Sequence, residues 1–294
     1  MSVIEIDQVT KDYGHHKGVF NISFDVKEGE VVGFLGPNGS GKTTTIRQLM
    51  GFIKPDRGTV SIMGMDCFKE ASLVQQQLGY LPGEIALMDD MTGLEFIYFM
   101  AKMKKIKNTT RIEELIQFLE LDARGKMKRM SKGMKQKIGL VIAFMQDAPV
   151  LILDEPTSGL DPLMQNKFVE LIQQEKAKGK TILMSSHIFE EVENTCDRVV
   201  MIKEGQIISI ETMENLKKSR LKHYEMTFVS EDEAIQFMKK YPDSKRQHHT
   251  ITVVSKEDIN HVLQQLTDYH LIDLNIRAQS LEELFLHYYG GHQL

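Results

Sequence analysis

The strongest constraint on this chain is a glycine-rich loop between a buried strand and a helix. The loop reads Gly36-Pro37-Asn38-Gly39-Ser40-Gly41-Lys42-Thr43, which fits the pattern G-x-x-x-x-G-K-[ST]. The apolar run 31–35 before it predicts a buried strand, and 43–50 after it predicts a helix that ends at Gly51. Because strand, loop and helix follow in this order, the pattern predicts a loop that binds the phosphates of a nucleotide.

The residue types in this loop suit a phosphate chain. Its glycines let successive backbone N–H groups point at phosphate oxygens, and the N-terminus of the following helix adds positive charge. Lys42 would reach the β- and γ-phosphates, and the Thr43 hydroxyl would ligate Mg²⁺. The predicted phosphate-binding residues are Gly36, Pro37, Asn38, Gly39, Ser40, Gly41, Lys42, Thr43 and Thr44.

Strands and helices alternate on both sides of this loop. An apolar run, 149–153, ends in Asp154 and Glu155, and the strand 181–184 is followed by Ser185-Ser186-His187. Such alternation predicts a mostly parallel sheet with helices packed on it. Because an open α/β sheet binds its ligand at the carboxyl ends of its strands, we expect these polar residues to lie beside the phosphate loop. Further strands are predicted at 3–9, 21–26 and 58–62, and helices at 92–103, 111–121, 162–178 and 188–196.

Composition limits the function further. With 294 residues and 26% charged residues, the chain is long enough for one large domain and a small one. A net charge of −5 gives no reason to expect nucleic acid as a partner. Two cysteines predict neither a disulfide framework nor a metal cluster, and we expect a reducing compartment. No signal peptide or membrane-spanning run is visible, so any membrane span would come from another subunit.

The pattern of apolar and polar residues changes near residue 209. The segment 211–221 reads as a linker, and residues 222–294 read as a small βαβαβα accessory domain. Three of its segments open with an acid-containing cap, namely Ser230 with Glu233, Ser255 with Asp258 and Ser280 with Glu283. The chemistry is therefore expected in residues 1–210, which include a helical insertion at about 84–140.

Six motifs in order give the chain a family resemblance. They are Tyr13, the phosphate loop, Ser131-Lys132-Gly133-Met134-Lys135-Gln136, Asp154-Glu155, Ser158-Gly159-Leu160-Asp161 and His187. Residues 3 to 210 resemble the ATP-binding subunit of an ATP-binding-cassette (ABC) transporter, most similarly one that partners a separate exporter-type permease. The tail 280–285 also resembles that of antibiotic- and peptide-export subunits.

The resemblance implies a role for each motif. Asp154 would hold Mg²⁺, Glu155 would polarise the attacking water, and His187 would sense the γ-phosphate. Tyr13 would stack on adenine, although a loop tyrosine is also a common packing residue. Ser131 and Gly133 would contact ATP held by a second cassette, identical or related, so that two chains enclose two ATP molecules. Asp161, in the motif after Glu155, is counted with the nucleotide-binding residues. The protein would then lie at the cytoplasmic face of the membrane, held there by its permease.

Two features depart from the family pattern. The usual signature is Leu-Ser-Gly-Gly-Gln; here Lys132 adds a cation that could face either phosphate or solvent. The glutamine that normally follows Tyr-Leu-Pro and ligates Mg²⁺ is replaced by Gly83. Glu84, one residue further on, could supply an oxygen to the metal, as hard Mg²⁺ prefers.

Other assignments of the sequence stay open. The stripe Phe96, Phe99, Met100 and Met103 fits either a helix core or a groove for a permease helix. A DNA-repair or chromosome ATPase would carry a long coiled coil between Lys42 and Ser131, and a translation-associated protein would carry two cassettes. A regulatory module that binds but barely hydrolyses ATP is opposed by the presence of both Glu155 and His187.

Overall fold

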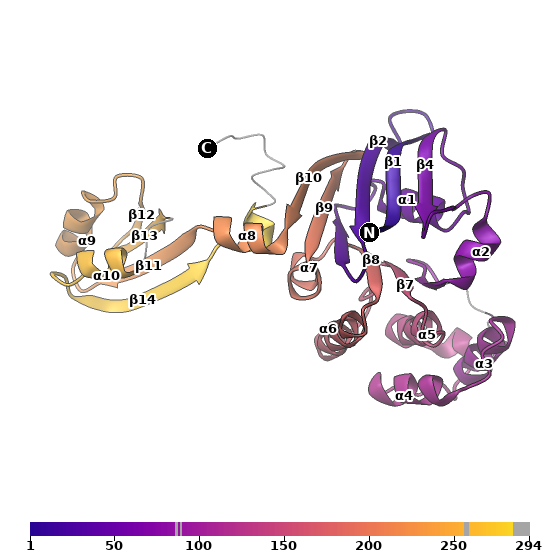
Figure 1. The fold of residues 1–294 in the computed structure, drawn as a ribbon. Helices are drawn as coiled ribbons and strands as arrows, with labels where there is room; N and C mark the ends of the chain where they lie inside the picture. Colours follow the sequence, from indigo (N-terminus) through magenta and orange to yellow (C-terminus); the bar gives the residue numbers. More distant parts are fainter. Residues whose placement is uncertain (86–87, 89, 256–258, 285–294) are drawn as a thin grey trace. The chain divides into compact units, whose positions relative to one another are not determined.

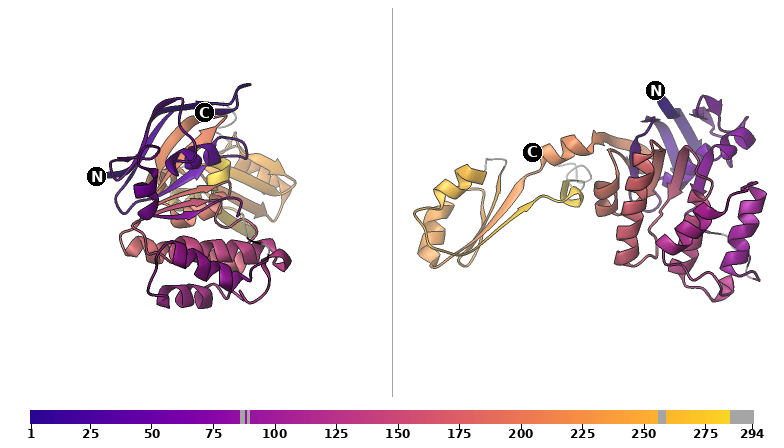
Figure 2. Two further views of the ribbon diagram at one scale, coloured as in Figure 1. Left: turned by 90° about the vertical axis from the view of Figure 1, so that its right-hand side faces the viewer. Right: turned by 60° about the horizontal axis from the view of Figure 1, so that its bottom comes forward.

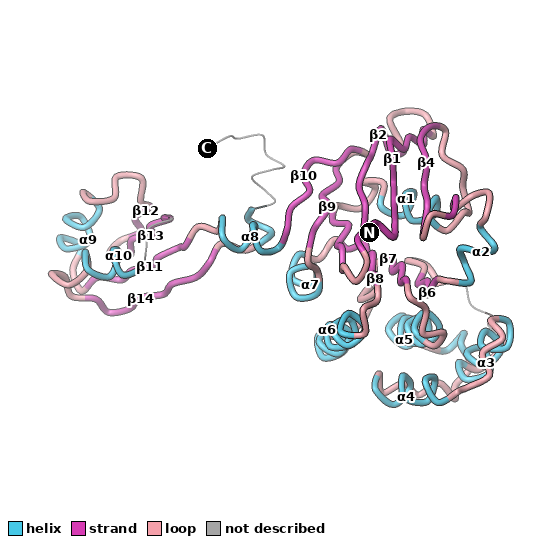
Figure 3. The backbone as a smooth tube through the Cα atoms, viewed as in Figure 1, coloured by secondary structure: helices cyan, strands magenta, loops and turns pink. Residues whose placement is uncertain are grey.

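The computed structural model describes residues 1–85, 88, 90–255 and 259–284 (Figure 1). The chain divides into two compact units, Met1–Met213 and Glu214–Leu294. Figure 3 marks helices and strands along the backbone, and both units contain both kinds of element. We describe each unit by itself.

A six-stranded sheet organises the first unit. Its order is β10-β9-β3-β8-β7-β6, and every neighbouring pair is parallel except β9 and β10. All residues of β3, β7 and β8 are buried, as continuous apolar runs require when helices or a second sheet cover both faces. Its strands are β3 (Val31–Leu35), β6 (Leu78–Leu81), β7 (Val150–Asp154), β8 (Thr181–Ser186), β9 (Arg198–Lys203) and β10 (Gln206–Thr212).

An antiparallel sheet of order β2-β1-β4-β5 packs on the first one. Side chains of both sheets share one apolar core, in which the rings of Phe24 and Phe34 lie 5.1 Å apart. The strands are β1 (Ser2–Asp12), β2 (Gly18–Lys27), β4 (Arg57–Ile62) and β5 (Met65–Asp66). Together the two sheets confirm the predicted α/β phosphate-loop fold with an antiparallel subdomain.

Helices follow the strands as the sequence predicts. Thr92 and Glu95 form the expected capping box, Ser131 caps the signature helix, and Asp161 caps a helix whose first residue is Pro162. Figure 1 and Figure 2 show α3 to α6 gathered on one side of the strands of this unit. The helices are α1 (Lys42–Leu49), α2 (Ala71–Gln76), α3 (Gly93–Met103), α4 (Thr110–Phe118), α5 (Lys132–Phe144), α6 (Pro162–Ala177) and α7 (Phe189–Thr195), with a 3₁₀ turn at Met127–Arg129.

The second unit is built on a four-stranded antiparallel sheet of order β12-β13-β11-β14. Two helices cover one face, and Tyr224, Phe228 and Phe237 are fully buried between helices and sheet. The chain order βαββαβ with this strand order is the ferredoxin-like arrangement. Its elements are β11 (Lys222–Phe228), α9 (Glu231–Met238), β12 (Lys245–Gln247), β13 (Thr250–Ser255), α10 (Ile259–Gln265) and β14 (Leu271–Ala278).

Some elements differ from the sequence expectation. The segment expected as a linker, 211–221, holds the end of β10 and all of α8 (Met213–Ser219). The βαβαβα pattern lacked β12, because its Lys-Arg-Gln sequence is wholly exposed and shows no apolar alternation. The caps at Ser230 and Ser280 are present, whereas the cap expected from Asp258 lies outside the described residues.

Candidate functional site

The phosphate loop connects the end of β3 to α1. Gly41 precedes the helix with φ 112°, a left-handed conformation that residues with a Cβ rarely adopt. A Cβ on Gly36 would lie 2.3 Å from the carbonyl oxygen of Ile202, so only glycine lets the loop start so close to β9. The loop is anchored from the sheet side, since Gly36 N donates to Ser186 O at 3.3 Å and Gly205 N donates to Ser40 O at 2.9 Å.

Lys42 is buried at the centre of this loop. Its Nζ donates to Gly36 O at 2.7 Å and to Pro37 O at 3.2 Å, and it lies 3.4 Å from Glu155 Oε1. Burial lowers the Lys42 pKa, while the charges of Glu155 and Asp154 oppose that shift. The ammonium group is thus a positive charge held by carbonyl and carboxylate oxygens, in a place where phosphate oxygens would find it.

Asp154 ends β7 with a carboxylate that is 1% exposed. Ser185 Oγ donates to its Oδ1, whereas Oδ2 has no hydrogen-bond partner in the described part of the chain. Burial raises the Asp154 pKa, and the hydroxyls of Ser185 and Thr43 oppose the rise. A buried, unpartnered carboxylate oxygen close to a threonine hydroxyl fits a hard cation such as Mg²⁺.

Gly83 lies directly against this carboxylate. A Cβ built on Gly83 would be 3.1 Å from Asp154 Oδ2, so position 83 faces the free oxygen. Glu84 is exposed. Within the described residues no group of three or more His, Cys, Asp or Glu side chains is placed to hold a metal.

Glu155 and His187 meet beside Lys42. His187 Nδ1 lies 2.9 Å from Glu155 Oε2, which leaves Oε1 of the same carboxylate facing Lys42. Glu155 has φ 48°, a strained left-handed backbone that the surrounding loop holds in place. Gln136 contributes to that hold, because its buried Nε2 donates to Glu155 O at 3.2 Å and to Pro156 O at 2.8 Å.

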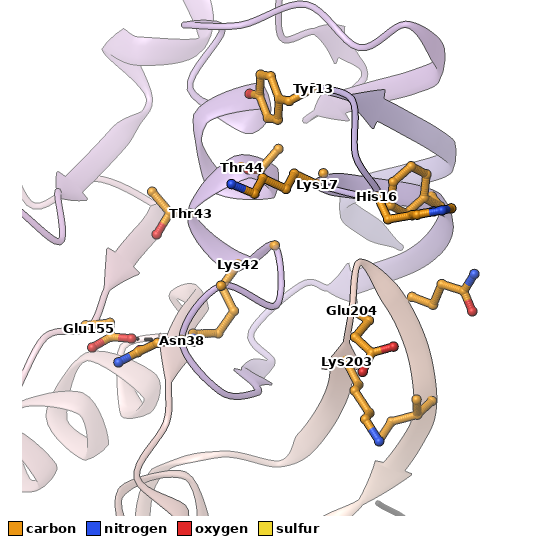
Figure 4. A pocket seen from close by; sticks show the side chains of 16 residues that line it. Tyr13, His16, Lys17, Asn38, Lys42, Thr43, Thr44, Glu155, Lys203 and Glu204 are labelled. Carbon is orange, nitrogen blue, oxygen red and sulfur yellow. Dashed lines mark ion pairs between the residues drawn. The ribbon is translucent and has the colours of Figure 1, made fainter.

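A cavity of about 970 Å³ extends from the phosphate loop to Tyr13. Figure 4 shows Lys42 and Thr43 between Tyr13 and Glu155, with Glu204 and Lys203 on a further wall. Tyr13 is 54% exposed, so its ring is open to a planar ligand. The cavity is lined by Tyr13, His16, Lys17, Gly18, Phe20, Asn38, Gly39, Gly41, Lys42, Thr43, Thr44, Glu155, Lys203, Glu204, Gln206 and Ile208.

The signature residues Ser131 and Gly133 are not among the residues that line this cavity. Ser131 Oγ accepts from Met134 N at the start of α5, and Asp161 Oδ1 accepts from Met164 N at the start of α6. Lys132 Nζ donates to Ser158 Oγ at 2.8 Å, so it contacts the loop after Glu155 in its own chain.

Three side chains that contact the site residues or their loops were not predicted as part of the site. Ser185 and Gln136 lie within motifs that the sequence analysis quotes, although no role was assigned to them. Glu191 had no comparable signal, because an acidic residue in the first turn of a helix is usually an exposed partner of the helix dipole. Here it is 7% exposed, and Ser186 Oγ donates to its Oε2.

Comparisons with known proteins identify the family of this chain. A profile of the family described as "ABC transporter" matches residues 19–158. The bacitracin transport ATP-binding protein BcrA of Bacillus licheniformis is 35% identical over 82% of this chain and 80% of its own length. The chain belongs to the ATP-binding subunits of ABC transporters. It is therefore an ABC transporter ATPase, as the six motifs predict.

Other relatives extend the match. The linearmycin resistance ATP-binding protein LnrL of Bacillus subtilis (strain 168) is 36% identical over 73% of this chain and 70% of its own length. YhcH, an ABC transporter ATP-binding protein of the same organism, is 31% identical over 98% of this chain and 96% of its own length. The similarity of this ABC subunit to YhcH therefore extends across both compact units.

Solved structures show the same fold. An ATP-binding subunit of an ABC transporter aligns with a TM-score of 0.67 and 31% identity, over 74% of this chain and 92% of that one. A dimeric bacterial ABC cassette aligns with a TM-score of 0.65 and 24% identity, over 71% of this chain and 98% of that one. None of the helices in the described part of this ABC subunit has the length and apolar character of a membrane span.

Glu191 gives the folded protein a predictable pH dependence. Burial raises its pKa from 4.5 to about 7; hydrogen bonds from Ser186 and Thr157 oppose the rise, and the Glu155 charge adds to it. Above pH 4.5 the unfolded chain loses the Glu191 proton more readily than the folded chain does. The contribution of Glu191 to the free energy of unfolding therefore falls as the pH rises to about 7. The variant Glu191→Gln lacks this loss. Its free energy of unfolding relative to wild type should therefore rise by roughly 3 kcal/mol between pH 4.5 and 7 and then stay level, as urea unfolding at several pH values would show. A constant difference would contradict the assignment.

Proposed function

We propose that this chain is the ATP-hydrolysing subunit of an exporter, and that two cassettes enclose two ATP molecules between them. The observation that supports this is the separation of the two halves of the site. Lys42, Asp154, Glu155 and His187 come together in one chain, whereas Ser131 lies outside the cavity that Lys42 lines. A second cassette would supply the signature residues, as ABC cassettes generally dimerise.

Each residue of the site would have its own role in ATP binding or hydrolysis, according to its position. Tyr13 would stack on adenine, and the phosphate-loop amides with Lys42 would hold the β- and γ-phosphates. Glu155 would accept a proton from the attacking water, while His187 would hold the Glu155 carboxylate and contact the γ-phosphate. Mg²⁺, held by Asp154 and Thr43, would neutralise phosphate charge. Most of the catalysis would then come from positioning and electrostatic stabilisation around the γ-phosphate.

The partner would be a separate permease, which would hold this subunit at the cytoplasmic face of the membrane. A groove on the helical subdomain is lined by Asp90, Met91, Leu94, Glu95, Tyr98, Phe99 and Lys102. The predicted stripe of Phe96, Phe99, Met100 and Met103 is not uniformly buried. Phe96 is in the core at 7% exposed, whereas Phe99 is 37% exposed. We assign the groove to a permease helix, because its aromatic and aliphatic side chains suit the apolar face of a helix. BcrA and LnrL are named for bacitracin transport and linearmycin resistance. An antibiotic or peptide would be the exported substrate.

The closed dimer tests the proposed function. With Glu155→Gln, ATP should bind but hydrolyse at least about a hundredfold more slowly, because no carboxylate accepts the proton. The ATP-loaded variant should then accumulate as a dimer in size-exclusion chromatography with light scattering, and ADP should leave it monomeric. Lys42→Ala is the matched control, since it removes phosphate binding. Monomers under all conditions would contradict the two-cassette site.

The groove assignment predicts a selective loss of the permease. Phe99→Ala should abolish copurification of a polytopic membrane subunit from gently solubilised membranes, because the aromatic contact is lost. ATP binding should be unchanged. Phe68→Ala, which removes another exposed phenylalanine at 44% exposure, should leave copurification intact. Equal recovery of the subunit with Phe99→Ala and wild type would count against this groove.

The metal assignment of Glu84 has its own test. Glu84→Ala should raise the Mg²⁺ concentration that gives half-maximal ATPase activity by about tenfold, because the ion loses an oxygen ligand. Glu70→Ala removes an acidic residue elsewhere and should leave that concentration unchanged. An unchanged Mg²⁺ requirement in Glu84→Ala would leave Asp154 and Thr43 as the chain's own ligands.

A further inference from the structure

Glu191 is a buried carboxyl group to which the proposed hydrolytic roles assign no task. It follows His187 by one turn of chain and lies in α7. Ser186 Oγ donates to Glu191 Oε2 and accepts from Ile188 N at 2.9 Å. The Ser186 hydroxyl thus closes the turn that carries His187, and Glu191 fixes the direction of that hydroxyl.

The surroundings of Glu191 connect it to both sides of the site. Its own backbone is held because Thr195 Oγ1 donates to Glu191 O at 2.6 Å. Ser186 O accepts from Gly36 N of the phosphate loop at 3.3 Å. The neighbouring Thr157 belongs to the turn directly after Glu155. One buried carboxylate therefore lies where the phosphate loop, the Glu155 turn and the His187 turn meet.

We propose that Glu191 is a positioning residue for ATP hydrolysis, which holds His187 against Glu155 by fixing Ser186. His187 is 44% exposed, so packing of its own ring does little to fix its place. What places its Nδ1 at 2.9 Å from Glu155 Oε2 is the backbone on either side of it. The inference rests on the proposed roles of His187 and Glu155 in the same site.

Three variants of the 294-residue chain separate this role from a merely structural one. Glu191→Ala should lower kcat roughly tenfold to a hundredfold, because misplacing a catalytic group costs rate more than binding. KM and the affinity for a fluorescent ATP analogue should change little. Glu191→Gln keeps an oxygen that accepts from Ser186, so it should retain most of the wild-type kcat. Ser186→Ala should lower kcat as Glu191→Ala does.

Coupling between the two residues is the decisive readout. The double variant Glu191→Ala with Ser186→Ala should be no slower than the slower single variant, since both changes remove one interaction. Glu190→Ala is the matched control, because Glu190 precedes Glu191 in the same helix and is exposed. It should behave as wild type. If Glu191→Ala does not fold, Ser186→Ala and Glu191→Gln still decide the question.

The outcomes distinguish the positioning role of Glu191 from the proposed roles of His187 and Glu155, on which it rests. Wild-type kcat in Glu191→Ala, additive losses in the double variant, or a Glu191→Gln as slow as Glu191→Ala would each overturn the positioning role. His187→Ala measured alongside tests the underlying site. If His187→Ala loses activity while Glu191→Ala does not, only the inference fails. If His187→Ala is fully active, the proposed role of His187 fails with it.

Discussion

The buried charge of Lys42 is the interaction on which the rest of the site depends. An ammonium group at 5% exposure is costly unless oxygen atoms surround it, and here two loop carbonyls and the Glu155 carboxylate do so. Those oxygens come from the ends of β3 and β7, which are separated in the sheet by β8. A parallel sheet with its carboxyl ends at one edge is therefore what allows this charge to be buried.

The same edge explains why the loops are mutually constrained. Two residues of β8 make these connections. Ser186 hydrogen-bonds to the phosphate loop, and Ser185 hydrogen-bonds to Asp154 and Glu155. Gln136 and Lys132 add contacts from the signature helix to the turn after Glu155. A shift of α5 would thus act on the backbone of Glu155. ATP held by a second cassette would contact Ser131 of this chain, at the start of α5. Through α5 it would therefore have a physical route to Glu155 of this chain.

Sequence alone predicted the parts of the fold that local patterns determine. The runs 31–35 and 149–153 are apolar throughout and became β3 and β7, and the capping box at Thr92 starts α3 as expected. β12 could not be predicted, because three exposed residues form a strand only by pairing with β13. Glu191 was missed for a related reason. Its surroundings include Ser186 at the end of β8 and Thr157, which is distant in the sequence, and no spacing in the helix reveals those contacts.

The central claim is that each ATP lies between Lys42 of one chain and Ser131 of another. Mixing a Lys42→Ala chain with a Ser131→Arg chain tests it directly, because each variant alone spoils both sites of its dimer. In a mixed dimer one site keeps both residues intact, so random exchange should restore ATPase activity to about a quarter of wild type. Activity that stays at the level of the two separate variants would contradict a site shared between chains.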